Sequence, residues 1–142
     1  MRIPVVLEET ASMPVYATAG SAGMDLRSTE EVELKPLERK LVKTGVRMAI
    51  PPGFEGQVRP RSGLALKRGI GMVNAPGTID SDYRGEIGVI LINLSDSVVK
   101  LENGERIAQL VICPVVQVEL TQEIDLDDTS RGEGGFGSTG TN

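Results

Sequence analysis

The polar segment 74–85 carries the residues best suited to acid–base chemistry. It contains Asp80 and Asp82 two positions apart, so their carboxylates share one face if the segment is extended. Because the chain contains no histidine, any general base must be a carboxylate, a lysine or a tyrosine. The alternative for an isolated Asp-X-Asp pair is a solvated loop in which both aspartates stabilise turns. Other polar residues near this pair decide between the acid–base interpretation and the turn-forming one.

A second polar segment, 59–63, is suited to binding phosphate. Arg61, Ser62 and Gly63 stand near the start of a predicted short helix, where free backbone N–H groups favour anions. The planar guanidinium of arginine also matches the oxygens of a phosphate group. Asp25, in the separate stretch GSAGMDLRS, adds another carboxylate.

The stretch 106–109 gives weaker evidence. As a strand, it would place Arg106 and Ala108 on one face and Ile107 and Gln109 on the other. The default interpretation is a structural arginine and a glutamine on an edge strand.

The C-terminal stretch DDTSRGEGGFGSTGTN is polar and rich in glycine. Gly132, Gly134 and Gly137 have the GxGxxG spacing, but only five residues follow, so the strand, helix and distant acid of a dinucleotide-binding unit are absent. Glycines still let backbone N–H groups approach phosphate, and Arg131 and neighbouring hydroxyls add donors. The stretch is either a disordered tail or a mobile phosphate clasp.

Phe136 is one of only four aromatic residues and lies among Gly, Ser and Thr. A platform that stacks on a ligand base explains this setting better than a place in the core. The alternative is a hydrophobic hook that docks the tail on its own or a neighbouring subunit.

Composition bounds the class of protein. The 142 residues fit one domain, 1–142, and the single cysteine, Cys113, excludes an internal disulfide or a CxxC zinc site. A net charge of −5 argues against a nucleic-acid surface, although 10 of the 15 cations are arginine. No apolar run is long enough to cross a bilayer. We therefore expect a soluble, cytoplasmic protein with no nucleic-acid or membrane partner.

Short apolar segments separated by Gly, Pro, Asn and Asp predict an all-β sandwich or barrel with one short helix, Ser62–Arg68. The predicted strands are Val5–Leu7, Met24–Arg27, Val32–Leu34, Lys40–Lys43, Arg47–Ile50, Phe54–Arg59, Gly71–Val73, Ile87–Leu94, Val98–Leu101, Ile107–Cys113 and Val115–Leu120.

Five segments, in order, resemble the motif set of the trimeric dUTPase family. They are Ala22–Leu26, Pro60–Leu64, Gly77–Gly85, Arg106–Gln109 and Arg131–Gly140. Each is weak alone, but five in one order with unbroken spacing make a specific match. Lys67-Arg68 follows the second motif, where many members carry Lys-His.

The resemblance implies a distorted jelly-roll β-barrel that assembles as a homotrimer, with active sites at the subunit interfaces. Residues 127–142 would form a mobile arm that closes a neighbouring subunit's site. The implied reaction is the Mg²⁺-dependent hydrolysis of dUTP to dUMP and pyrophosphate, which keeps uracil out of DNA and supplies dUMP for thymidylate synthesis.

The resemblance also implies residue roles. Asp80 would activate the water that attacks the α-phosphorus, and Asp25 would contact the metal through water. Tyr83 would lie under the deoxyribose and Phe136 would stack on uracil. The implied substrate-binding set is Arg61, Ser62, Gly63, Asn74, Gly77, Thr78, Ile79, Tyr83, Gln109, Arg131, Phe136, Gly137, Ser138 and Thr139.

Three alternatives stay open at this point. A dCTP deaminase of the same superfamily, acting alone or bifunctionally, would share the barrel and some motifs. A catalytically silent protein would bind nucleotide for regulation, and a structural jelly-roll subunit would not respond to nucleotide at all.

Overall fold

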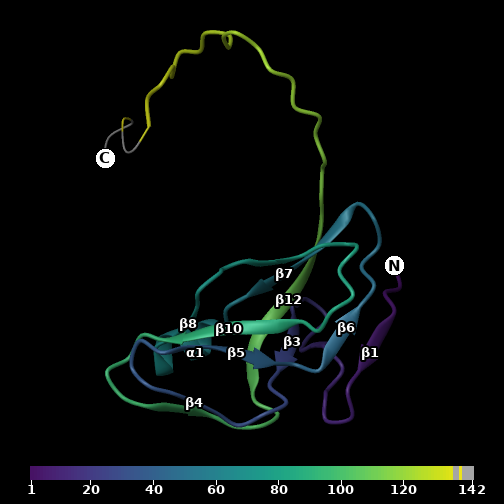
Figure 1. Cartoon of the computed structure of the whole chain (residues 1–142), viewed down its shortest axis with the longest axis vertical. Helices are drawn as coiled ribbons and strands as arrows, with labels where there is room; N and C mark the ends of the chain where they lie inside the picture. The colour runs from purple at the N-terminus through teal and green to yellow at the C-terminus, as the bar shows by residue number, and fades with distance from the viewer. Residues whose placement is uncertain (136–137, 139–142) are drawn as a thin grey trace.

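The computed structural model describes residues 1–135 and 138 (Figure 1). Within this range the chain forms twelve strands and one helix. They are β1 (Val5–Leu7), β2 (Val15–Tyr16), β3 (Met24–Arg27), β4 (Val32–Leu34), β5 (Arg39–Lys43), β6 (Val46–Met48), β7 (Phe54–Arg59), α1 (Ser62–Arg68), β8 (Ile70–Met72), β9 (Gly77–Ile79), β10 (Gly88–Asn93), β11 (Val99–Leu101) and β12 (Arg106–Pro114).

The strands pair antiparallel in four small sheets. The largest has the order β2-β3-β12-β7-β9, the second has β5-β10-β8, and two further pairs are β1-β6 and β4-β11. This is the expected jelly-roll-like β fold. The expected barrel is not closed by hydrogen bonds in the described part of the chain, because the short strands end in turns before neighbouring sheets can join edge to edge.

Alternation along the strands selects the side chains that fill the core. β10 buries every second residue, and β4, β6 and β11 each bury both ends around an exposed centre. Leu26 is fully buried between Asp25 and Arg27, and removing such a side chain from water contributes about 1.5–3 kcal/mol. Burial of Leu26 therefore fixes β3 with both of its charged neighbours on the opposite face.

β12 is the central strand of the largest sheet. It pairs with β3 on one side, through Gln109 opposite Asp25, and with β7 on the other, through Gln109 opposite Arg59. The register shifts between Arg106 and Ala108, so Ile107 and Ala108 are both buried. The predicted alternation over 106–109 and the predicted edge position of Gln109 are therefore wrong. An extra residue in the bulge breaks the period of two, and β3 and β7 flank the strand.

Helix α1 has the predicted bounds. Arg61, its N-cap residue, is extended (φ −99°, ψ 126°), and Gly69 ends the helix in the left-handed region with φ 65°. Leu64 is the helix's buried residue, so the remaining side chains of this short helix face outward.

Two short strands escaped prediction and one predicted strand does not form. β2 and β9 have two and three residues, too few to show a pattern. Residues 115–120 alternate apolar and polar side chains, yet Val116, Val118 and Leu120 are 73–89% exposed and unpaired. A strand needs a partner, and residues 1–135 and 138 of a single chain offer none for this segment.

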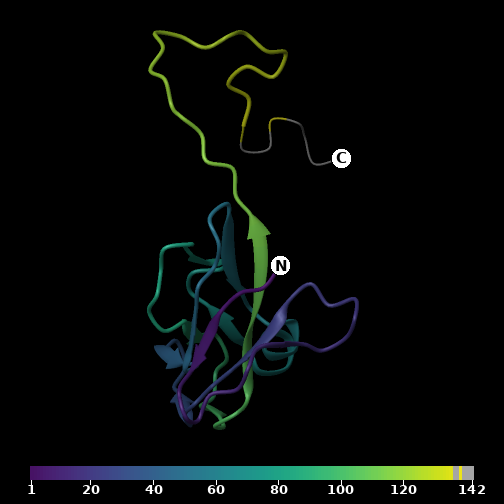
Figure 2. The ribbon, with the colours of Figure 1, turned by 90° about the vertical axis from the view of Figure 1, so that its right-hand side faces the viewer.

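From β12 onward the chain leaves the sheets. Residues 115–133 are exposed and run away from the rest of the molecule (Figures 1 and 2). The helix in the described range is far too short and polar to cross a membrane.

Candidate active site

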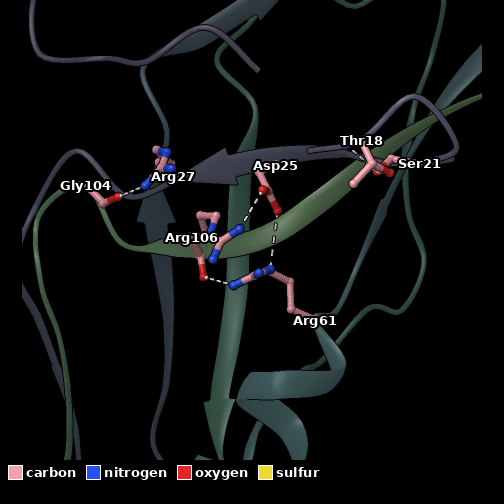
Figure 3. A network of polar contacts seen from close by, with 7 residues as sticks. All are labelled: Thr18, Ser21, Asp25, Arg27, Arg61, Gly104 and Arg106. Carbon is pink, nitrogen blue, oxygen red and sulfur yellow. Dashed lines mark hydrogen bonds and ion pairs between the residues drawn. The ribbon is translucent and has the colours of Figure 1, made fainter. Parts of the chain in front are cut away.

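Three charged side chains from three segments meet beside β3. Asp25 Oδ1 lies 3.4 Å from Arg61 Nε, and Asp25 Oδ2 lies 3.2 Å from Arg106 Nη1 (Figure 3). Arg61 Nη1 also donates a hydrogen bond to the carbonyl oxygen of Arg106, at 3.1 Å. We call Asp25, Arg61 and Arg106 the arginine cluster.

The arginine cluster has the charge and the donors to bind a phosphate group. One carboxylate faces two guanidinium groups, which leaves one net positive charge. The Asp25 side chain is only 15% exposed, whereas Arg61 and Arg106 are 26% and 44% exposed. Arg61 Nη1 is already bonded to the Arg106 carbonyl oxygen. The donors left for a phosphate are therefore the exposed N–H groups that neither Asp25 nor this carbonyl engages, in the planar arrangement that matches phosphate oxygens.

Ser62 and Gly63 extend this surface into the first turn of α1. Both residues are exposed, and a Cβ placed on Gly63 would meet nothing within 4 Å. The hydroxyl of Ser62 and the backbone at Gly63 are therefore accessible to a ligand that contacts Arg61.

Gln109 joins the motifs around it. Its Nε2 donates to the carbonyl oxygen of Pro60 at 3.0 Å, directly before Arg61. A Cβ on Gly23 would come within 2.7 Å of Gln109 Oε1, so the side chain fills the space that this glycine leaves. Gln109 also lines a shallow hollow with Ala75 and Pro76. Its position ties the first, second and fourth motifs together.

A separate pocket of about 330 Å³ lies beside β9; we call it the β9 pocket. β9 pairs with β7, Gly77 opposite Val58 and Ile79 opposite Gly56. Asn74 stands on the turn before it, and a Cβ on Gly77 would lie 3.2 Å from Asn74 Nδ2. The lining residues are Leu41, Lys43, Asn74, Thr78, Ile79, Asp80, Tyr83, Glu86, Gly88 and Ile90.

Asp80 stands at the end of β9 and is exposed. Within residues 1–135 and 138, no hydrogen bond or ion pair engages its carboxylate. Its carbonyl oxygen accepts a hydrogen bond from the Tyr83 backbone N–H, so residues 80–83 form a turn. Residues 80–83 are therefore not extended, and the condition under which Asp80 and Asp82 would share one face is not met. Asp80 lines the β9 pocket.

The Tyr83 ring is held against its own loop. Its hydroxyl donates to the Glu86 carbonyl oxygen at 2.9 Å. A Cβ on Gly85 would lie 2.3 Å from the Tyr83 hydroxyl oxygen, so only glycine lets the ring lie so close to the backbone. Tyr83 is 43% exposed as a residue and forms part of the wall of the β9 pocket.

Five residues of this pocket were missed from the sequence. They are Leu41, Lys43, Glu86, Gly88 and Ile90. Leu41, Lys43 and Gly88 come from two strands that pair across the neighbouring sheet, Gly88 opposite Lys43. A Cβ on Gly88 would lie 2.6 Å from Leu41 Cδ1, so these two residues are in close contact, but nothing in the sequence of either segment shows this.

The described part of the C-terminal stretch makes only local contacts. Arg131 Nε donates to the Gly134 carbonyl oxygen at 2.7 Å, and Ser138 N donates to the Gly135 carbonyl oxygen at 3.0 Å. Phe136, Gly137 and Thr139 lie outside the described residues. Of the predicted binding residues, the structure brings Asp25, Arg61 and Gln109 together at one place and Asn74, Thr78, Ile79, Asp80 and Tyr83 at another.

Comparisons with known proteins agree with these motifs. A sequence model of the dUTPase family matches residues 9–140. A deoxyuridine 5'-triphosphate nucleotidohydrolase from Anaeromyxobacter sp. (strain Fw109-5) is 62% identical over 128 residues, which cover 90% of this chain and 87% of that protein.

Solved structures of dUTPases resemble this chain as well. A mutant of the Staphylococcus bacteriophage 80alpha dUTPase with dUpNHpp superposes with a TM-score of 0.92 at 32% identity, covering 99% of both chains. A mutant dUTPase from phage phi11 of S. aureus, described for its coordination of a structural Mg(II) ion, has a TM-score of 0.84 at 28% identity and covers 90% of this chain and all of that one. The family match over nearly the whole chain, together with these relatives, shows that the chain belongs to the dUTPase family and hydrolyses dUTP.

Proposed function

We propose that the chain cleaves dUTP between the α- and β-phosphates, with Asp80 as the base that activates the attacking water. The observation that carries this proposal is that Asp80 lines the β9 pocket with a carboxylate that pairs with no group among residues 1–135 and 138. The water oxygen forms a bond to the α-phosphorus, and the bond from that phosphorus to the bridging oxygen breaks. Asp80 accepts the water's proton, and the products are dUMP and pyrophosphate.

The arginine cluster binds the phosphate chain in this proposal. Arg61 contacts the phosphate oxygens, Ser62 and Gly63 supply hydroxyl and backbone donors, and Gln109 lies on the wall beside them. Positive charge placed where the leaving pyrophosphate develops its charge stabilises the transition state.

The β9 pocket binds the nucleoside. Asn74, Gly77, Thr78 and Ile79 would contact uracil, and Tyr83 would lie under the deoxyribose. The pocket's size of about 330 Å³ suits one nucleoside. If the turn 74–77 hydrogen-bonds uracil, cytosine in the same place leaves enclosed groups unpaired, which costs about 1–3 kcal/mol for each group.

The phosphate chain and Asp25 are the groups that would hold a magnesium ion. The described residues contain no group of three or more His, Cys, Asp or Glu side chains that could hold a metal ion. Asp25 suits a place in the outer coordination shell of the metal. Its contacts to the arginines leave carboxylate lone pairs free to accept a hydrogen bond from a metal-bound water. When bound, Mg²⁺ would neutralise phosphate charge.

A homotrimer would complete the site. The arginine cluster and the β9 pocket have no hydrogen bond or ion pair between them in residues 1–135 and 138 of one chain. In a closed ring of three copies, Asp80 of one copy would face the arginine cluster of the next. Residues 127–142 would form the arm that closes the site, with Arg131, Ser138 and Thr139 on the γ-phosphate and Phe136 and Gly137 at the base.

A nucleotide panel tests the reaction. Pyrophosphate release is measured from dUTP, dCTP, dTTP and UTP, with and without Mg²⁺, and each nucleotide product is identified. We expect dUMP from dUTP alone, in the presence of Mg²⁺. Ammonia release from dCTP, or tight binding of dUTP without turnover, would overturn the proposal.

Mixing two inactive variants tests the interfacial site. Asp80→Asn and Arg61→Ala chains are purified separately, unfolded together in equal amounts and refolded. If the two residues act from different copies, roughly a quarter of the sites in random trimers regain both groups and activity returns to that level. If both residues act within one copy, the mixture stays inactive.

A further inference from the structure

Glu86 connects the loop that carries Tyr83 to a turn in another part of the fold. Its Oε1 accepts hydrogen bonds from the backbone N–H groups of Thr44, at 3.1 Å, and Gly45, at 2.8 Å. Thr44 and Gly45 form the connection between β5 and β6, about forty residues before Glu86 in the chain. One carboxylate oxygen therefore anchors the Tyr83 loop across the sheet.

The Thr44–Gly45 turn, which binds the Glu86 carboxylate, is itself packed and hydrogen-bonded. Thr44 and Gly45 are buried, and Gly45 has φ 65°. A Cβ on Gly45 would come within 2.6 Å of Ala11 Cβ, so the turn is packed on its outer side as well. The Thr44 hydroxyl donates to the Ile87 carbonyl oxygen, and the Ile87 N–H donates to the Val46 carbonyl oxygen at 2.8 Å.

At the other end of this connection, the backbone of Glu86 is bonded to the Tyr83 ring. The loop 80–87 contains no strand or helix, so its backbone has few bonds of its own to hold it. The Glu86 carbonyl oxygen, which accepts the Tyr83 hydroxyl, belongs to the residue that the turn fixes. Arg84 Nη1 also donates to the carbonyl oxygens of Ser81 and Tyr83 inside the loop. The two N–H bonds to Glu86 Oε1 are the ones that join the side chain of the residue accepting the Tyr83 hydroxyl to the buried turn.

We propose that Glu86 is a positioning residue that sets sugar specificity by holding Tyr83 in the wall of the β9 pocket. The inference rests on the proposed function, in which Tyr83 lies under the deoxyribose. A ring held in place rejects an added 2′-hydroxyl by contact, whereas a ring free to move makes room for it. Removing the hydrogen bonds to the Glu86 carboxylate is therefore expected to raise kcat/KM for UTP relative to that for dUTP.

Two substitutions separate hydrogen bonding from charge. Glu86→Ala removes the acceptor, and we expect the ratio of kcat/KM for dUTP to that for UTP to fall about ten-fold. Because both N–H groups bind the same oxygen, the amide oxygen of Glu86→Gln can replace it, and we expect this variant to recover most of the wild-type ratio. Tyr83→Phe should lower the ratio as Glu86→Ala does, and the double variant should fall no further.

Glu38→Ala is the matched control. Glu38 Oε2 accepts the Lys35 backbone N–H at 2.8 Å in the loop before β5, outside both parts of the site. This hydrogen bond holds the pKa of Glu38 below its usual value, so the control also removes an ionised carboxylate. We expect no change in the dUTP to UTP ratio.

Affinities for dUMP and UMP, measured by titration calorimetry, give a readout that does not need turnover. A smaller preference for dUMP in Glu86→Ala supports the inference. An unchanged preference in a folded variant overturns it, as does a Glu86→Gln variant that behaves like Glu86→Ala. If the wild-type chain itself does not prefer dUTP, the proposed function fails and not the positioning role alone.

Discussion

Asp25 and Asp80 are the same residue type in opposite surroundings. Both carboxylate oxygens of Asp25 face arginines, and its side chain is 15% exposed. Asp80 is exposed at the end of β9, and its carboxylate pairs with none of residues 1–135 or 138. The ion pairs of Asp25 hold the guanidinium groups of Arg61 and Arg106 in place. The carboxylate of Asp80, which pairs with none of the described residues, is available to accept a proton.

Replacing Asp80 should give the largest effect. Asp80→Asn keeps the size of the side chain but removes its basicity, so we expect kcat to fall about 10³-fold with KM little changed. The midpoint of thermal unfolding should stay the same, because the carboxylate makes no contact in the described chain. Initial rates of pyrophosphate release test this, and a loss of only a few-fold would show that another group activates the water.

Replacing Asp25 should act through the arginines. In Asp25→Asn only one oxygen remains to accept from Arg61 or Arg106, and the amide N–H₂ group opposes the other guanidinium. We expect kcat/KM to fall about 10- to 100-fold, mainly through KM, since the phosphate contacts lose their orientation. Combining it with Arg106→Ala should give less than the sum of the two effects. Strict additivity would mean that Asp25 does not act through Arg106.

Filling the space beside Gln109 should have a smaller effect. The added methyl of Gly23→Ala lies 2.7 Å from Gln109 Oε1 and must displace that side chain. We expect kcat/KM to fall about ten-fold with a modest drop in the unfolding midpoint. Gly20→Ala is the matched control, because its Cβ meets nothing within 4 Å. Equal losses in the two variants would remove Gln109 from the explanation.

Replacing Arg68, at the C-terminal end of α1, should have the smallest effect on activity. Arg68 Nη1 lies 2.6 Å from Glu105 Oε1, and its Nη2 donates to the Lys100 carbonyl oxygen. Arg68→Ala should lower the free energy of unfolding by about 1 kcal/mol, measured in urea, because a partly exposed ion pair and one hydrogen bond are lost. We expect kcat/KM to change less than two-fold. A ten-fold loss would place this end of the helix in the site as well.

Local signals predicted the elements that depend on local structure. α1 has the predicted bounds because Gly69 gives a clear end, and β7 has its predicted bounds because its residues suit a strand and Gly53 precedes it in a turn. β9 was missed because its pairing with Val58 and Gln57 comes from far along the chain and its sequence opens with glycine. The bulge before Ala108 also has no local signature.

The motifs contain the three residues of the arginine cluster and four residues that line the β9 pocket, but they do not show which side chains contact each other. Asp25 and Arg106 are 81 positions apart, and nothing in either segment shows that they form an ion pair. Glu86 was missed for the same reason, since its acceptor role depends on the Thr44–Gly45 turn. Residues 115–120 show the opposite error, because alternation predicts a strand only where the fold supplies a neighbour.

The exposed C-terminal stretch also makes the molecule sensitive to protease at one defined bond. Between Pro114 and Arg131 the chain contains no lysine or arginine, and residues 115–133 are exposed. Brief digestion with trypsin should therefore cut first after Arg131 and release residues 132–142 while the packed sheets stay intact. The rate of that single cut, followed by mass spectrometry, reports how exposed the bond after Arg131 is. If the stretch closes over bound nucleotide as proposed, dUTP analogues should slow the cut.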